Sequence, residues 1–84
     1  MSKPVYTRAA QKALGVMTKG DAAQLVSRIN NYAADPMTPN IDVDRVKGRP
    51  GVYRIRWGRW RALFRVEDSE MRIYQIEHRR EVYR

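Results

Sequence analysis

The hydrophobic pattern of this 84-residue chain changes its period once, at the turn pair Pro50-Gly51. Before Pro36, apolar residues recur three and four positions apart, which is the spacing of an amphipathic helix. After Gly51 they alternate with polar residues, which is the spacing of a half-buried strand. Helices followed by strands are typical of the α+β class, and the length fits one domain over residues 1–84.

Two helices are predicted in the first half of the chain. Thr7 is a typical N-cap, and the apolar positions within residues 10–17 share one helical face. Thr18 is a second cap, and the helical period continues until Asp35-Pro36, because the residue before a proline is disfavoured in a helix. The tight link between the two segments predicts an αα-hairpin.

A meander of strands is predicted in the second half. Residues 36–50 form a long connection with at most one short extended piece. Alternating segments at residues 52–57 and 60–66 are joined by Gly58-Arg59, which has the length and the leading glycine of a two-residue hairpin turn. A third strand is expected at about residues 71–77.

The hairpin turn sets which residues face one another. Trp57 lies opposite Trp60 on the apolar face, where both belong to the core, and Arg56 lies opposite Arg61 on the other face. The predicted fold is therefore an N-terminal αα-hairpin packed on one face of a small antiparallel β-sheet. The basic face of that sheet is left open.

Positive charge is concentrated on these strands. The chain has 17 Lys plus Arg against 9 Asp plus Glu, a formal net charge of +8 that favours a polyanion or an acidic protein as partner. Residues 45–65 hold basic side chains and no acid, namely Arg45, Lys47, Arg49, Arg54, Arg56, Arg59, Arg61 and Arg65. Alternating arginines are often only the solvated face of a sheet, but an acid-free block of this size favours phosphate binding.

Several function classes are excluded. Without cysteine there is no disulfide and no thiol nucleophile, and a single histidine argues against a metal site, so no cofactor is expected. No phosphate-binding glycine motif and no stretch of about 20 apolar residues occurs. We therefore expect a cytoplasmic protein that does not enter membranes.

RNA cleavage remains compatible with such a face. The 2′-hydroxyl of RNA attacks the adjacent phosphate without a metal if the protein orients it, removes its proton and stabilises the added charge. His78 is the side chain most suited to move protons at neutral pH, although a lone histidine near a chain end is more often a surface residue.

The sequence resembles the RelE/ParE superfamily of bacterial toxins. The resemblance covers nearly the whole chain and rests on Tyr6-Thr-Arg-Ala-Ala, Tyr32-Ala-Ala-Asp-Pro36, Lys47-Gly48, Pro50-Gly-Val-Tyr-Arg-Ile-Arg56, Trp60-Arg-Ala-Leu-Phe64 and His78-Arg-Arg-Glu-Val-Tyr-Arg84. It implies a toxin of a type II toxin-antitoxin system with a RelE-like fold. In the RelE branch it implies an endoribonuclease that cuts mRNA on the ribosome and thereby inhibits translation.

The resemblance also implies residue roles. The catalytic set is Arg54, Arg56, Arg61, His78, Arg79 and Tyr83, and the RNA-binding set is Arg45, Lys47, Arg49, Arg59, Arg65 and Arg80. Well-known RelE toxins have lysine where this chain has arginine on the first catalytic strand, and arginine is a poor general base. Base catalysis then falls to His78 or to electrostatic activation of the hydroxyl. The short segment from Lys3 to Tyr6 forms at best a brief edge strand.

Two alternatives stay open. A ParE-like toxin of the same fold would poison DNA gyrase and cut no RNA, as the missing lysine suggests. A module without activity would use its basic face for binding alone. In each case the expected partner is an acidic antitoxin, partly disordered when free, that forms a hetero-oligomer with the toxin; the nuclease also requires the ribosome and mRNA.

Overall fold

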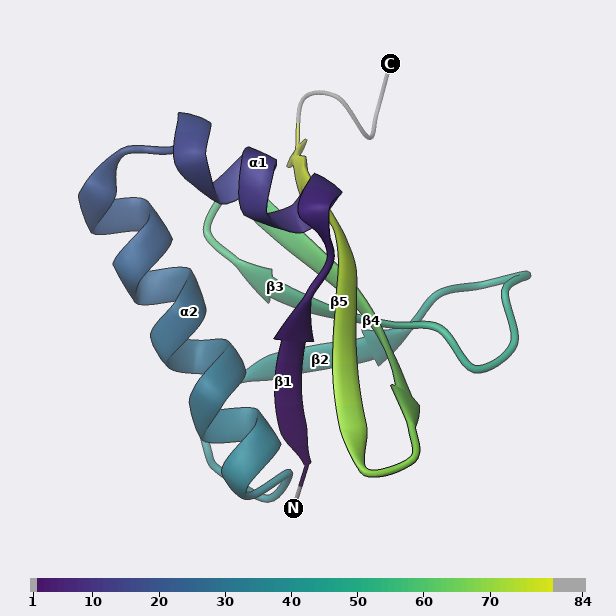
Figure 1. The fold of residues 1–84 in the computed structure, drawn as a ribbon. Helices are drawn as coiled ribbons and strands as arrows, with labels where there is room; N and C mark the ends of the chain where they lie inside the picture. The colour runs from purple at the N-terminus through teal and green to yellow at the C-terminus, as the bar shows by residue number, and fades with distance from the viewer. Residues whose placement is uncertain (1, 80–84) are drawn as a thin grey trace.

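The structure is a computed structural model that describes residues 2–79. Its elements are, in chain order, β1 (Lys3–Tyr6), α1 (Arg8–Val16), α2 (Lys19–Ala34), β2 (Asp42–Arg45), β3 (Tyr53–Trp57), β4 (Trp60–Glu67) and β5 (Glu70–His78). The strands form one sheet in the order β1-β5-β4-β3-β2, with the two helices beside it (Figure 1). The α+β prediction is confirmed.

Both helices begin at the predicted caps. The Thr7 side chain accepts a hydrogen bond from the backbone N–H of Ala10, and the Thr18 side chain accepts one from the N–H of Asp21. Each bond satisfies a backbone donor that a helix start leaves without a partner. Helix α2 ends at Ala34, directly before Asp35-Pro36, as the sequence predicts.

The central hairpin has the predicted register. Gly58 has a φ of 58°, a conformation that costs glycine little, and the turn pairs Trp57 with Trp60 and Arg56 with Arg61. The predicted strand bounds agree with β3, β4 and β5 to within one residue. The short extended piece expected between residues 36 and 50 is β2, which pairs antiparallel with β3.

The sheet is mixed rather than wholly antiparallel. Strand β1 pairs in parallel with β5, from Lys3 beside Glu70 to Tyr6 beside Ile73. Within β2 to β5, each pair of neighbouring strands is antiparallel, as expected. The brief edge strand predicted at residues 3–6 therefore exists, and it adds a parallel edge next to the last strand.

The core lies between the helices and one face of the sheet. Side chains of both helices and of β3, β4 and β5 form one buried cluster, made of Ala10, Met17, Leu25, Ile29, Ala33, Ile55, Ala62, Phe64, Met71 and Ile73. Trp57 and Trp60 pack against it, as predicted. Val66 continues the alternation of β4 but is 51% exposed. No helix within residues 2–79 is long and apolar enough to cross a membrane.

Candidate functional site

The face of the sheet that points away from the core, here called the outer face, carries a row of four charged side chains. The register places Asp42 of β2 beside Arg56 of β3, Arg56 beside Arg61 of β4, and Arg61 beside Glu77 of β5. Their chain neighbours, such as Ile55 and Ala62, point into the core, so strand alternation directs the charges outward. We call Asp42, Arg56, Arg61 and Glu77 the arginine row.

The two arginines of β3 are already engaged by aspartates of the edge strand. Arg54 donates from Nε to Asp44 Oδ1 at 3.0 Å and from Nη2 to Asp44 Oδ2 at 2.8 Å. This two-point contact and the charge of Arg54 hold the pKa of Asp44 below its ordinary value. Arg56 donates from Nη2 to Asp42 Oδ1 at 3.1 Å, and this hydrogen bond raises the pKa of Arg56.

These pairs change the predicted electrostatics of the face. The basic block at residues 45–65 contains no acid, but Asp42 and Asp44 lie just before it and fold back against it. The outer face thus bears arginines with built-in carboxylate partners. A phosphate bound there competes with, or binds beside, these carboxylates.

Arg61 is held more tightly than its neighbours. Only 8% of this residue is exposed, and its Nη1 donates to the backbone carbonyls of Gly58 at 3.2 Å and Trp60 at 2.9 Å. The guanidinium therefore ties the hairpin turn to the outer face. Its position is fixed before any ligand binds.

The structure does not bring His78 to the arginine row. His78 pairs with Trp60 across the strands, and the two rings meet edge to face with their centroids 4.9 Å apart. Trp60 packs against the core and donates from Nε1 to Asp21 of α2. His78 therefore lies on the helix side of the sheet, whereas Arg61 lies on the outer face. The expectation that both act on one phosphate lacks support from this placement.

The last predicted site residues lie at the end of β5. The backbone N–H of Arg79 donates to the carbonyl of Arg59 in the hairpin turn, which places residue 79 at the end of the sheet that carries the arginine row. Arg80 and Tyr83 lie outside the residues that the structure describes.

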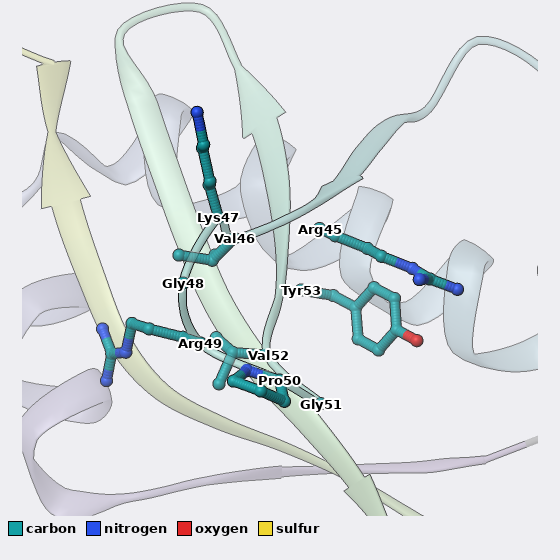
Figure 2. A pocket seen from close by; sticks show the side chains of 9 residues that line it. All are labelled: Arg45, Val46, Lys47, Gly48, Arg49, Pro50, Gly51, Val52 and Tyr53. Carbon is teal, nitrogen blue, oxygen red and sulfur yellow. The ribbon is translucent and has the colours of Figure 1, made fainter.

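The predicted RNA-binding residues of the β2–β3 loop do not converge on one point. This loop projects from the sheet in Figure 1, and residues 45–53 line a cavity of about 550 Å³. Figure 2 shows Arg45 extending beside Tyr53, with Lys47 and Arg49 directed elsewhere. Such an arrangement suits contacts with several phosphates along a strand better than a grip on one.

Tyr74 is an aromatic residue of the basic surface that the sequence pattern did not reveal. The β4–β5 register shifts between Leu63 and Phe64, which leaves Tyr74 as an extra residue in β5. The guanidinium groups of Arg49 and Arg65 lie 5.8 and 5.9 Å from its ring centroid. A β-bulge leaves no simple periodic signal, so alternation alone could not have placed this ring.

Glu77 is the second residue that sequence reasoning missed. It accepts a hydrogen bond from the Gln75 side-chain amide, and it takes part in none of the ion pairs formed within residues 2–79. The register of β5 against β4 was the signal that could have revealed it. In the same residues, no group of three or more His, Asp or Glu side chains is placed to hold a metal ion.

Comparisons with known proteins agree with this architecture. Residues 5–83 match the family model described as the ParE toxin of the type II toxin-antitoxin system parDE. No curated protein matches the sequence.

Solved structures share the fold at low sequence identity. The toxin-antitoxin complex RelB-RelE of Methanococcus jannaschii contains a chain 19% identical, with a TM-score of 0.79 and 94% of each chain covered. The RelE-RelB complex of Pyrococcus horikoshii gives 20% identity and a TM-score of 0.77, covering 93% of this chain and 94% of that one. The RelBE2 complex of Mycobacterium tuberculosis gives 20% and 0.74, covering 93% and 98%.

The family model spans nearly the whole chain, and the fold is that of RelE toxins, so the predicted superfamily is confirmed. The chain belongs to the ParE toxin family and is a type II toxin-antitoxin toxin of the RelE/ParE superfamily.

Proposed function

We propose that this toxin is an endoribonuclease that cleaves mRNA on the ribosome and so blocks translation. The observation that carries the proposal is the placement of three arginines, Arg54, Arg56 and Arg61, on the sheet face opposite the helices. One guanidinium group can donate two parallel hydrogen bonds to a phosphate, and it stays positively charged at any physiological pH. The similarity of the fold to solved RelE structures also supports this proposal.

The proposed mechanism follows from how each arginine is held. Arg61 is fixed by two backbone carbonyls, so it meets the charge of the transition state with little reorganisation. Arg56, one strand away, binds the other side of the same phosphate when that phosphate displaces or joins Asp42. Arg54, oriented by Asp44, holds the neighbouring part of the message.

Other roles rest on the resemblance. Arg79 assists protonation of the leaving 5′-oxygen, and Tyr83 positions a base. The loop cations Arg45, Lys47 and Arg49 contact more distant phosphates of the message or of ribosomal RNA. No metal takes part, because the nucleophile is the 2′-hydroxyl of the substrate itself.

The proposed partner besides the ribosome is an acidic antitoxin. Structurally similar RelE chains were solved in complex with RelB antitoxins. A net charge of +8 on 84 residues favours an acidic segment as a ligand, and such a ligand stabilises the toxin by mass action.

A second candidate is inhibition of DNA gyrase without RNA cleavage. Two observations favour it: the matching family model is the ParE family, and Arg54 and Arg56 are already paired with aspartates. In this case the outer face binds protein, and its ion pairs are part of the binding surface.

One experiment separates the candidates. The toxin is expressed without its partner, and new 5′-ends of mRNA are mapped in translated and untranslated regions. We expect cuts within translated codons that disappear in Arg56→Ala and persist in Lys12→Ala, which removes an exposed charge from α1. Growth arrest with intact messages and gyrase-dependent DNA breaks would instead establish the second candidate.

A further inference from the structure

We propose that Glu77 is the general base that removes the proton from the attacking 2′-hydroxyl. The inference rests on the proposed function, since it assigns a residue to the first step of that reaction. Well-known RelE toxins have a lysine on the first catalytic strand where this chain has arginine, which is a poor base. The reaction therefore needs another group to remove the proton.

The position of Glu77 satisfies the geometry of such a base. Glu77 is paired with Arg61 in the β4–β5 register and stands in the arginine row. Neighbouring strands lie about 4.8 Å apart, so a phosphate bound midway between Arg56 and Arg61 is about one and a half strand spacings, roughly 7 Å, from β5. A ribose on the β5 side of that phosphate lies within this gap, where the three-bond side chain of Glu77 reaches it.

The carboxylate of Glu77 is held without being neutralised. The Gln75 amide donates to Oε1, which fixes the orientation of the group and leaves Oε2 to accept a proton. Within residues 2–79 Glu77 belongs to no ion pair, whereas Asp42 and Asp44 each bind a guanidinium group. Asp44 is a weaker proton acceptor than an ordinary aspartate, because the hydrogen bond from Arg54 and its charge favour the ionised form and lower its pKa.

The other titratable groups near the row fit the role less well. Arginine does not give up its proton in proteins, so Arg54, Arg56 and Arg61 act only as cations. His78 meets Trp60 edge to face on the helix side of the sheet. Glu77 is therefore the carboxylate of the row that lies beside the fixed Arg61 and carries no cation of its own among the described residues.

The proton of the 2′-hydroxyl passes to Glu77 Oε2 while the 2′-oxygen forms a bond to phosphorus. The bond from phosphorus to the 5′-oxygen breaks, that oxygen takes a proton from a donor on the opposite side, and the proton on Glu77 returns to solvent. The products are a 2′,3′-cyclic phosphate and a 5′-hydroxyl.

The test uses the full chain, ribosomes and a defined mRNA under single-turnover conditions. Glu77→Gln keeps the shape and removes the proton acceptor, and we expect the cleavage rate to fall about 100-fold or more with ribosome binding unchanged. Glu67→Gln makes the same charge change at the exposed far end of β4 and should cleave at the wild-type rate. Thermal unfolding of each variant establishes that it is folded.

A modified substrate separates the base from an acid. When sulfur replaces the 5′-bridging oxygen at the cleavage site, the leaving group no longer needs a proton. We expect Glu77→Gln to remain equally impaired on this substrate, whereas rescue would overturn the assignment as base. Should Glu77→Gln fail to fold, Glu77→Ala is measured instead; it removes the carboxylate altogether, and full activity in it would likewise overturn the proposal.

The outcomes distinguish the inference from the function on which it rests. If the wild type cleaves and Glu77→Gln cleaves within about threefold of it, Glu77 is not the base and the nuclease assignment stands. If the wild type fails to cleave ribosome-bound mRNA, the nuclease assignment itself falls and the assignment of Glu77 falls with it.

Discussion

Arg56 and Arg61 face each other across β3 and β4, and each has a carboxylate on its far side. Like charges directly opposed in a sheet are destabilising, and flanking opposite charges offset that cost. Across β2, β3, β4 and β5 the charges follow the order negative, positive, positive, negative. This order allows a small sheet to carry two adjacent guanidinium groups. A bound phosphate adds the negative charge that the centre of this row lacks.

The Asp44–Arg54 pair predicts a stability difference that depends on pH. Because the folded pKa of Asp44 is lowered from 3.8, its ionised form stabilises the fold fully above that value, and this contribution is lost as the pH falls through the lower folded pKa. The Asp44 side chain is 37% exposed, so solvent screens the pair. We expect Asp44→Asn to lower the free energy of unfolding by about 0.5 kcal/mol at neutral pH. Urea unfolding at about pH 7 and about pH 2 measures the effect, which should be smaller at the acidic pH; an undiminished difference there would contradict the ion-pair explanation.

We expect substitution of Arg61 to lower the stability of the fold as well as the activity. Arg61→Ala leaves the carbonyls of Gly58 and Trp60 without their side-chain donor at a nearly buried position. We expect the free energy of unfolding to fall by about 1–2 kcal/mol. Arg59→Ala, in the turn two residues before Arg61 and exposed, should change it by less than about 0.5 kcal/mol. Equal effects of the two substitutions in thermal unfolding would show that the backbone contacts of Arg61 contribute little.

At the scale of elements, local signals predicted what local interactions determine. Thr7 and Thr18 cap the helices, and the two-residue turn at Gly58 fixes the β3–β4 register. The parallel pairing of β1 with β5 joins the two ends of the chain, and four residues are too few to show which strand they pair with. Such non-local pairing is decided by packing, which the hydrophobic period does not encode.

The candidate site also has features that the local sequence predicted and features that depend on non-local strand pairing. Strand alternation predicted that Arg54, Arg56 and Arg61 share a face, and the structure agrees. The pairing of Asp42 and Asp44 with these arginines depends on β2 joining the sheet edge, which the loop-like composition of residues 36–50 did not predict. The faces on which His78 and Glu77 lie depend on the register of β5, which places His78 beside Trp60 and Glu77 beside Arg61.

The two helix caps predict unequal losses of stability. Thr18→Ala removes one N-cap hydrogen bond, and we expect the free energy of unfolding to fall by about 1 kcal/mol. Thr7→Ala removes the cap of α1 and also the bond from its hydroxyl to the carbonyl of Tyr74 in β5. It should therefore cost more than Thr18→Ala in urea unfolding. The reverse order would mean that the contact between Thr7 and β5 does not hold α1 against the sheet.

At the scale of the whole molecule, charge is divided along the chain. Residues 1–42 hold five basic and three acidic side chains, and residues 43–84 hold twelve and six, so the excess is +2 against +6. The first half supplies the two helices and the edge strand β1, and the second half supplies nearly all of β2 and the whole of β3, β4 and β5. The structure thus gives the positive field to the sheet, while the helical layer completes the core.

This division predicts how binding of single-stranded RNA depends on salt. Each phosphate contact made by an arginine or lysine contributes about 0.7 to the slope of log affinity against log salt concentration, because binding releases counterions. Arg56→Ala should therefore reduce the magnitude of the slope by about 0.7 between about 50 and 200 mM salt, whereas Lys12→Ala on α1 should leave it unchanged. Fluorescence anisotropy with a short labelled RNA measures both slopes. Equal reductions of the slope in the two variants would mean that RNA responds only to the net charge of +8 and not to the outer face. The expected difference would identify the outer face as the RNA-binding surface independently of any cleavage.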